Sequence, residues 1–260
     1  MKPVSEAYKD FPIMHKTHNG KRVIYLDSGA TAQIPQMVID RLVDHMTKHN
    51  GNPHRGSHIL AVEASEAYEN ARDRVVKFIN AKQREEVIFT RNSTESMNLI
   101  AHCYGLNNVK KGDKILITVA EHHANLVTWQ YVANQTGATL EYMYLDNHGH
   151  LKEGELDKID SSTKIVAFAH VSNVLGMEFP VRQIIDKAHS VGAVAVLDGA
   201  QSTPHMKIDV QALDCDFFVF SGHKMCASQG IGVLYGKREL LEAMPPFLMG
   251  DRKSTRLNSS

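Results

Sequence analysis

Residues 216–224 read Asp-Phe-Phe-Val-Phe-Ser-Gly-His-Lys, a short apolar run that ends in a serine, a glycine, a histidine and a lysine. The apolar run is typical of a buried β-strand, and Lys224 follows soon after its end. A lysine in such a setting is costly to keep uncharged or unpaired. Lys224 is therefore either a structural charge at a strand end or a reactive amine.

The composition of the whole chain narrows its class. Of its 260 residues, 43% are hydrophobic and 22% charged, which is the balance of a globular protein with one large α/β domain or two small ones. Lys+Arg and Asp+Glu both number 29, which argues weakly against a nucleic-acid-binding protein. No run approaches the ~18 apolar residues of a membrane span, and the N-terminus lacks the apolar core of a signal peptide. We expect no nucleic-acid or membrane partner.

The cysteines and histidines show no metal or disulfide pattern. Cys103, Cys215 and Cys226 are scattered and odd in number, without zinc-ligand spacing. This usage favours a reducing, cytoplasmic location. His148 and His150 have the sequence context of a turn, and we expect no metal site there or elsewhere.

Short apolar runs alternate with amphipathic helical stretches, which is typical of crossover connections and a mostly parallel sheet. Runs such as 165–169 are continuously apolar, as expected when helices cover both faces. Strands are expected at 23–26, 87–90, 114–118, 140–145, 164–170, 193–198, 217–220 and 232–235. Helices are expected at 36–48, 61–79, 94–102, 125–134 and 180–190.

The pattern divides the chain into three parts. Residues 1–20 form an N-terminal segment, and residues 21–250 a large domain. Residues 251–260 are polar and without periodicity, so we expect a non-native or disordered tail on a piece of a longer protein.

Polar side chains follow several predicted strands, where sites form in open sheets of this kind. After 87–90, we expect Ser93 or Thr94 to cap the next helix, whose start offers either a plain cap or a phosphate cradle. After 114–118, His122 and His123 cannot face one way, so they are no simple metal pair. They are either a solvated pair, or one ring lies flat against an aromatic ligand.

The next strand ends carry an amide, an acid and a lysine. Asn173 suits an ordinary turn or an amide presented to a ligand. Asp198 ends an apolar strand and needs a cationic partner, and Gln201 lies within a turn's reach of it. The last of these strand ends delivers Ser221, His223 and Lys224.

One cofactor would use all of these groups. Pyridoxal 5'-phosphate has a phosphate, an aromatic ring, a ring nitrogen that stays protonated, a ring oxygen and an aldehyde that condenses with an amine. Lys224 would supply the amine, which desolvation and neighbouring charge keep partly deprotonated. Asp198 would hold the proton of the ring nitrogen.

Seven motifs also resemble a known family: Asp27-Ser-Gly-Ala-Thr, Asn52-Pro-His-Arg-Gly-Ser-His, Arg91-Asn-Ser-Thr-Glu-Ser-Met-Asn, Glu121-His-His-Ala-Asn, His170-Val-Ser-Asn-Val-Leu-Gly, Asp198-Gly-Ala-Gln and Ser221-Gly-His-Lys. Together they resemble class V aminotransferase-fold enzymes, and within these the cysteine desulfurases of the sulfur-mobilisation (SUF) type. The resemblance runs from about residue 20 to 250.

The resemblance implies a homodimeric pyridoxal-phosphate enzyme of fold type I. Its large domain would hold a mostly parallel seven-stranded sheet between helices, with the small C-terminal domain missing. Such enzymes convert L-cysteine to L-alanine and pass the sulfur, carried as a persulfide, to an acceptor protein for iron–sulfur cluster assembly.

The resemblance also implies a role for each motif residue. Lys224 would be the catalytic lysine that forms the Schiff base, and His122 a catalytic residue stacked on the ring. Asp198 would pair with the ring nitrogen and Gln201 with the ring hydroxyl. Asn173 would lie near the substrate carboxylate. The phosphate would be held by Ser93, Thr94, Ser221 and His223.

Two departures from the family set limits on this interpretation. Met225–Gln229 replaces the family's Gly-Pro turn. The family's acceptor cysteine and substrate-binding arginine lie in a C-terminal domain beyond Ser260, so we expect the chain to bind the cofactor weakly and to lack turnover. Cys226 does not match the acceptor position. Cys103 and Cys215 are expected to be structural.

Two alternatives stay open at this point. One is another class V enzyme, a selenocysteine lyase, an aminotransferase or a kynureninase-like enzyme. The other is a fragment that binds pyridoxal phosphate, or only dimerises, without catalysis.

Overall fold

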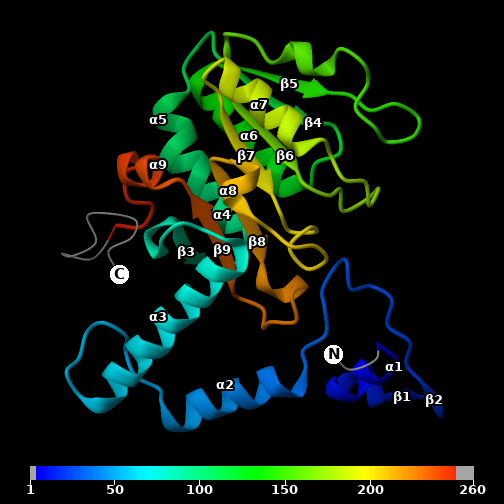
Figure 1. The fold of residues 1–260 in the computed structure, drawn as a ribbon, viewed down its shortest axis with the longest axis vertical. Coiled ribbons are helices and arrows are strands. Elements are labelled where there is room, and N and C mark those ends of the chain that lie inside the picture. The colour runs from blue at the N-terminus through cyan, green and yellow to red at the C-terminus, as the bar shows by residue number, and fades with distance from the viewer. Residues whose placement is uncertain (1–3, 250–260) are drawn as a thin grey trace.

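The computed structural model describes residues 4–249 (Figure 1). Its centre is a seven-stranded sheet with the order β3-β9-β8-β7-β6-β4-β5. All neighbours are parallel except β9, which is antiparallel to both β3 and β8. The predicted mostly parallel sheet is confirmed. Its strands are β3 (Val87–Thr90), β4 (Lys114–Thr118), β5 (Thr139–Met143), β6 (Thr163–Ala169), β7 (Val194–Asp198), β8 (Phe217–Ser221) and β9 (Gly232–Gly236).

Helices cover both faces of this sheet. Alternate strand residues point to opposite sides of the sheet, so each strand contributes apolar side chains to both layers. On one face, Leu116 and Val166 belong to the same apolar cluster as Ile184 of α7 (Val181–Ser190). On the other, Ile117 belongs to the same apolar cluster as Trp129 of α6 (His123–Thr136). The remaining α-helices of the described residues are α1 (Val4–Ala7), α2 (Gln36–Lys48), α3 (Ile59–Ile79), α4 (Ser93–Ile100), α5 (Leu106–Asn108), α8 (Val210–Leu213) and α9 (Arg238–Ala243).

Most of the N-terminal part lies away from the sheet, although residues 27–32 reach the ends of its strands. Figure 1 shows α2 and the first part of α3 extending away from it, and α2 buries none of its residues. The strand predicted at 23–26 is wrong: Ile24 is 75% and Leu26 91% exposed, and the segment has no neighbouring strand in the described part of the chain. A strand needs a partner for its backbone groups, and only the preceding hairpin of β1 (Thr17–His18) and β2 (Lys21–Arg22) has one.

Several predicted boundaries shift by one or more residues. α4 ends at Ile100 and continues as a π-helical turn, Ala101–Gly105, and β5 ends at Met143. The predicted tail at 251–260 lies outside the described residues. None of the described helices is long and apolar enough to cross a membrane.

Candidate active site

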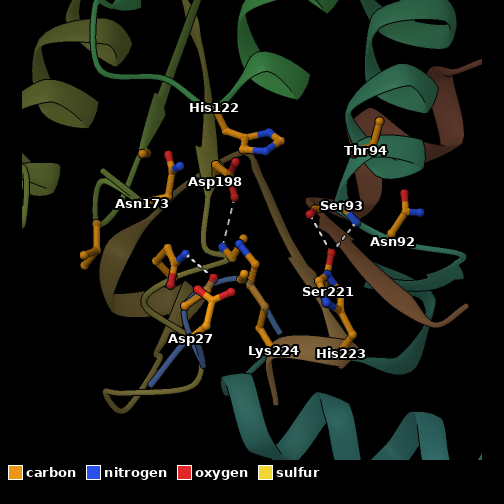
Figure 2. Close-up of a pocket in the computed structure, with 16 residues that line it drawn as sticks. Asp27, Asn92, Ser93, Thr94, His122, Asn173, Asp198, Ser221, His223 and Lys224 are labelled. Atoms are coloured by element: carbon orange, nitrogen blue, oxygen red, sulfur yellow. Dashed lines mark hydrogen bonds between the residues drawn. The ribbon is translucent and has the colours of Figure 1, made fainter. Parts of the chain in front are cut away.

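A cavity of about 510 Å³ lies at the carboxyl ends of the strands (Figure 2). Loops after β3, β4, β6, β7 and β8 line it, together with residues 27–30 of the N-terminal part. Asp27 and Asn92 also line it; neither is a predicted site residue, although each lies in one of the seven motifs. The structure brings together all nine predicted site residues: Ser93, Thr94, His122, Asn173, Asp198, Gln201, Ser221, His223 and Lys224.

The start of α4 forms one side of this cavity. Asn92 caps the helix, because its side-chain oxygen accepts a hydrogen bond from Glu95 N at 2.9 Å. The cap expected at Ser93 or Thr94 is therefore wrong: the helix begins at Ser93 itself. The Ser93 hydroxyl is free to bond elsewhere, and it lies 2.7 Å from the Ser221 hydroxyl at the end of β8. The positive end of α4 and two hydroxyl groups thus meet at one point.

His122 lies at the start of α6. Its Nδ1 accepts a hydrogen bond from Ala124 N at 3.1 Å, which orients the ring. His122 and His123 are both exposed, and only His122 lines the cavity. Its charge acts on Asp198, and Figure 2 shows the two side chains near each other.

Asp198 and Lys224 face the same cavity. Asp198 is 7% exposed, and its Oδ1 accepts one hydrogen bond, from Ala200 N at 2.9 Å. Burial raises the pKa of Asp198, and the charges of Lys224 and His122 oppose that rise. Burial lowers the pKa of half-buried Lys224, while the charge of Asp198 raises it. Asp198 and Lys224 make no direct ion pair in the described structure. Lys224 is therefore the predicted cationic partner of Asp198 only through the longer-range effect of its charge.

The segment at 27–32 closes the cavity from below in Figure 2. Gln201 Nε2 donates to Gly29 O at 2.8 Å, and Ala32 N donates to His223 O at 2.8 Å. Thr31 Oγ1 lies 3.2 Å from His223 Nδ1. Two predicted site residues therefore also fasten the N-terminal part of the chain to the sheet.

The sequence pattern of the family described as Aminotransferase class-V matches residues 24–259, nearly the whole chain. The chain belongs to the class-V aminotransferase family. Enzymes of this family use pyridoxal 5'-phosphate, the cofactor that the sequence analysis predicts.

The curated relatives of this class-V chain include cysteine desulfurases. A "Probable cysteine desulfurase" of Synechocystis sp. is 49% identical over 243 residues, which cover 93% of this chain and 58% of the relative. One of Halalkalibacterium halodurans is 51% identical, covering 94% and 61%. The chain thus spans about three fifths of the length of these relatives.

Solved structures agree with this class-V fold. The cysteine desulfurase CsdA from Escherichia coli is 39% identical with a TM-score of 0.85, over 97% of this chain and 62% of that one. The apo cysteine desulfurase from Thermococcus onnurineus NA1 is 39% identical with a TM-score of 0.89, over 96% and 61%.

The loop after Lys224 is closed by backbone hydrogen bonds, although it lacks the Gly-Pro turn expected from the resemblance. Gly222 O accepts hydrogen bonds from Met225 N at 2.8 Å and from Ala227 N at 3.1 Å, while Gly222 N donates to Ile231 O at 2.9 Å. Cys226 adopts a positive φ of 61° within this loop. The sequence departure at 225–229 therefore still permits a closed turn behind Lys224.

None of the three cysteines lines the cavity. Cys103 and Cys215 are buried, and Cys226 is half-buried. Burial raises the pKa of Cys103 to about 11 and raises those of Cys215 and Cys226 as well. A thiol with a raised pKa is a poor nucleophile, which favours a structural role for Cys103 and Cys215.

Proposed function

We propose that the chain is the cofactor-binding part of a cysteine desulfurase, which converts L-cysteine to L-alanine and passes the sulfur on as a persulfide for iron–sulfur cluster assembly. The observation that carries the proposal is the single cavity shared by Lys224, Asp198 and the hydroxyl-lined start of α4. The names of the relatives at about 50% identity support the choice of substrate.

The residues present fit pyridoxal phosphate. Asp198 is a buried carboxylate that accepts a hydrogen bond from Ala200 N, so it has acceptor capacity left for a ring N–H. Lys224 is an amine whose pKa burial lowers, so more of it is neutral than of an exposed lysine. The start of α4 offers the phosphate a positive helix end.

We assign the predicted roles on this basis. Asp198 would hold the proton of the ring nitrogen, and Lys224 would attach the cofactor through its aldehyde. When bound, the cofactor supplies an electron sink for bond breaking in the amino-acid substrate. Ser93, Thr94, Ser221 and His223 would hold the phosphate.

Three further residues would orient the ring and the substrate. His122 is fixed by its bond from Ala124 N and would lie against the ring. Gln201 would meet the ring hydroxyl. Asn173, in the turn after β6, would contact the substrate carboxylate.

The location, the oligomeric state, the sulfur acceptor and the division of the chain are part of the same proposal. We propose a cytoplasmic homodimer that delivers sulfur to an acceptor protein, with residues 1–20 as an N-terminal segment and 21–250 as the large domain. The turn between β1 and β2 falls at residues 19–20, at that boundary. Cofactor binding is proposed for the 260-residue chain, and turnover for the protein at the full length of its relatives.

The first experiment adds pyridoxal phosphate to the 260-residue chain and records the visible absorbance. Lys224→Ala should remove the shifted cofactor band, whereas Lys187→Ala, which changes a partly buried lysine on α7 that does not line the cavity, should keep it. An unchanged spectrum in Lys224→Ala would refute the role of this amine. L-cysteine given to a full-length form, with alanine and sulfide measured, separates a desulfurase from an aminotransferase, and L-selenocysteine in parallel identifies a selenocysteine lyase.

A further inference from the structure

Glu121 precedes His122 and does not itself line the cavity. Its Oε1 accepts hydrogen bonds from the Thr118 hydroxyl at the end of β4 and from Ala169 N at the end of β6, the latter at 3.1 Å. Its Oε2 accepts a hydrogen bond from Asn125 Nδ2 of α6 at 2.6 Å. One carboxylate therefore ties the turn that carries His122 to two strand ends.

The partners of this carboxylate are all donors. Trp129 Nε1, which can only donate, bonds to Asn125 Oδ1 at 2.7 Å, so the amide of Asn125 turns its NH2 toward Glu121. The Thr118 oxygen accepts from Ala120 N at 3.2 Å, which leaves its proton for Glu121. The third partner is a backbone N–H. Three donors favour the ionised form of a carboxyl group.

A second carboxylate lies on the neighbouring strand. Ala169, which donates to Glu121, pairs with Asp198 across β6 and β7. Burial raises the pKa of Glu121 to about 7, supported by the charge of Asp198 and opposed by the three hydrogen bonds. Lys224 from the loop after β8 and His122 from the start of α6 are the titratable groups whose charges act on Asp198.

We propose that Glu121 is a positioning residue for this site: its carboxylate fixes the turn of His122 and places a second negative charge behind Asp198. That charge stabilises positive charge in the cavity, including a proton held at Nζ of Lys224. The inference rests on the pyridoxal-phosphate site proposed above.

The test is the pH at which the visible absorbance of the chain, with pyridoxal phosphate added, changes with protonation. Glu121→Gln keeps the size of the side chain and removes its charge. Above pH 7, where Glu121 is ionised, the apparent pKa of the spectral change should fall by about one unit, as expected when one nearby charge is removed at an effective dielectric constant of about 20.

A second variant covers a failure of Glu121→Gln to fold. In the double variant Glu121→Gln/Asn125→Asp, the side-chain NH2 of residue 121 can donate to the carboxylate of residue 125, which restores the hydrogen bond between the two positions. The negative charge then lies on α6 and no longer at the turn that carries His122. The apparent pKa of the double variant should lie between those of the wild type and Glu121→Gln. The matched control is Glu155→Gln, a buried acid that accepts from Tyr144 N at 2.8 Å and does not line the cavity.

The outcomes separate the two proposals. A wild-type chain without a shifted cofactor band refutes the proposed function. If the wild-type chain shows the band and both Glu121 variants have the same apparent pKa as the wild type, the proposed role of Glu121 is overturned. It is also overturned if Glu155→Gln shifts the apparent pKa as much as Glu121→Gln does. A purely structural role would weaken cofactor binding without moving the apparent pKa.

Discussion

Ser221 Oγ lies 2.8 Å from Ser93 N and 2.7 Å from Ser93 Oγ, although 128 residues separate the two serines in the chain. The contact joins the end of β8 to the first residue of α4. The antiparallel strand β9 lies between β3 and β8, so it sets the spacing across which the two serines meet. The proposed phosphate site therefore depends on two loops from different parts of the sheet.

Ser221→Ala should weaken cofactor binding, because it removes a hydroxyl from the proposed phosphate site and releases the start of α4. The dissociation constant of pyridoxal phosphate should rise roughly 5- to 15-fold, the effect of losing about 1–1.5 kcal/mol of hydrogen bonding. Fluorescence or absorbance titration measures it. Ser190→Ala, at the exposed end of α7, is the control, and equal affinities in both variants would contradict the prediction.

Asp198→Asn should shift cofactor attachment to lower pH. Burial lowers the pKa of Lys224 and the charge of Asp198 raises it, so removal of that charge lowers the pKa further. Only the neutral amine attacks the aldehyde. The pH at which the rate of cofactor attachment is half-maximal should therefore fall together with the pKa of Lys224. Stopped-flow absorbance between pH 6 and 10 measures the midpoint, and an upward move would refute the coupling.

Gly232→Ala should destabilise the fold near the site. A Cβ on Gly232 would come within 2.5 Å of the backbone of Asn92, the cap of α4. Overpacking of this kind costs about 1–3 kcal/mol, and it should also displace the start of α4. Urea unfolding measures the loss. Gly29→Ala is the control, because its Cβ would meet nothing nearer than Gln201 Nε2 at 4.0 Å; a similar loss there would contradict the steric argument.

Glu121 should make the cofactor-free chain less stable as the pH rises. Its folded pKa, about 7, lies above the ordinary value of 4.5, so the folded state binds the extra proton between these two values. Stability contributed by that proton is present below pH 4.5 and is lost as the pH rises through 7. The difference in unfolding free energy between wild type and Glu121→Gln should fall by roughly 1–3 kcal/mol from pH 5 to 8. A flat difference would contradict the raised pKa.

Much of the fold was predictable because it depends on local periodicity. Continuous apolar runs predict buried parallel strands, and β3, β4 and α2 have the predicted bounds. The segment at 23–26 shows the limit of this reasoning. Its apolar residues suit a strand, but strand formation depends on a partner that only the tertiary structure supplies.

The site was predictable to a similar extent. Residues at the carboxyl ends of neighbouring strands meet at one edge of a sheet, so the nine predicted residues line one cavity. Their roles stay predictions. Asn92 was missed as the cap of α4 because an Asn-Ser-Thr run offers three competent caps, and packing against Gly232 accompanies the one observed.

The sequence by itself determined the class of fold, the set of reactive side chains and the family, since these depend on residue type and short-range spacing. Only the tertiary structure decided that Ser93 meets Ser221, that Glu121 joins two strand ends and α6, and that Asp198 acts on Lys224 without touching it. Hydrogen bonds and charge interactions depend on distance in space, and the packing of the sheet sets the distances between residues far apart in the chain.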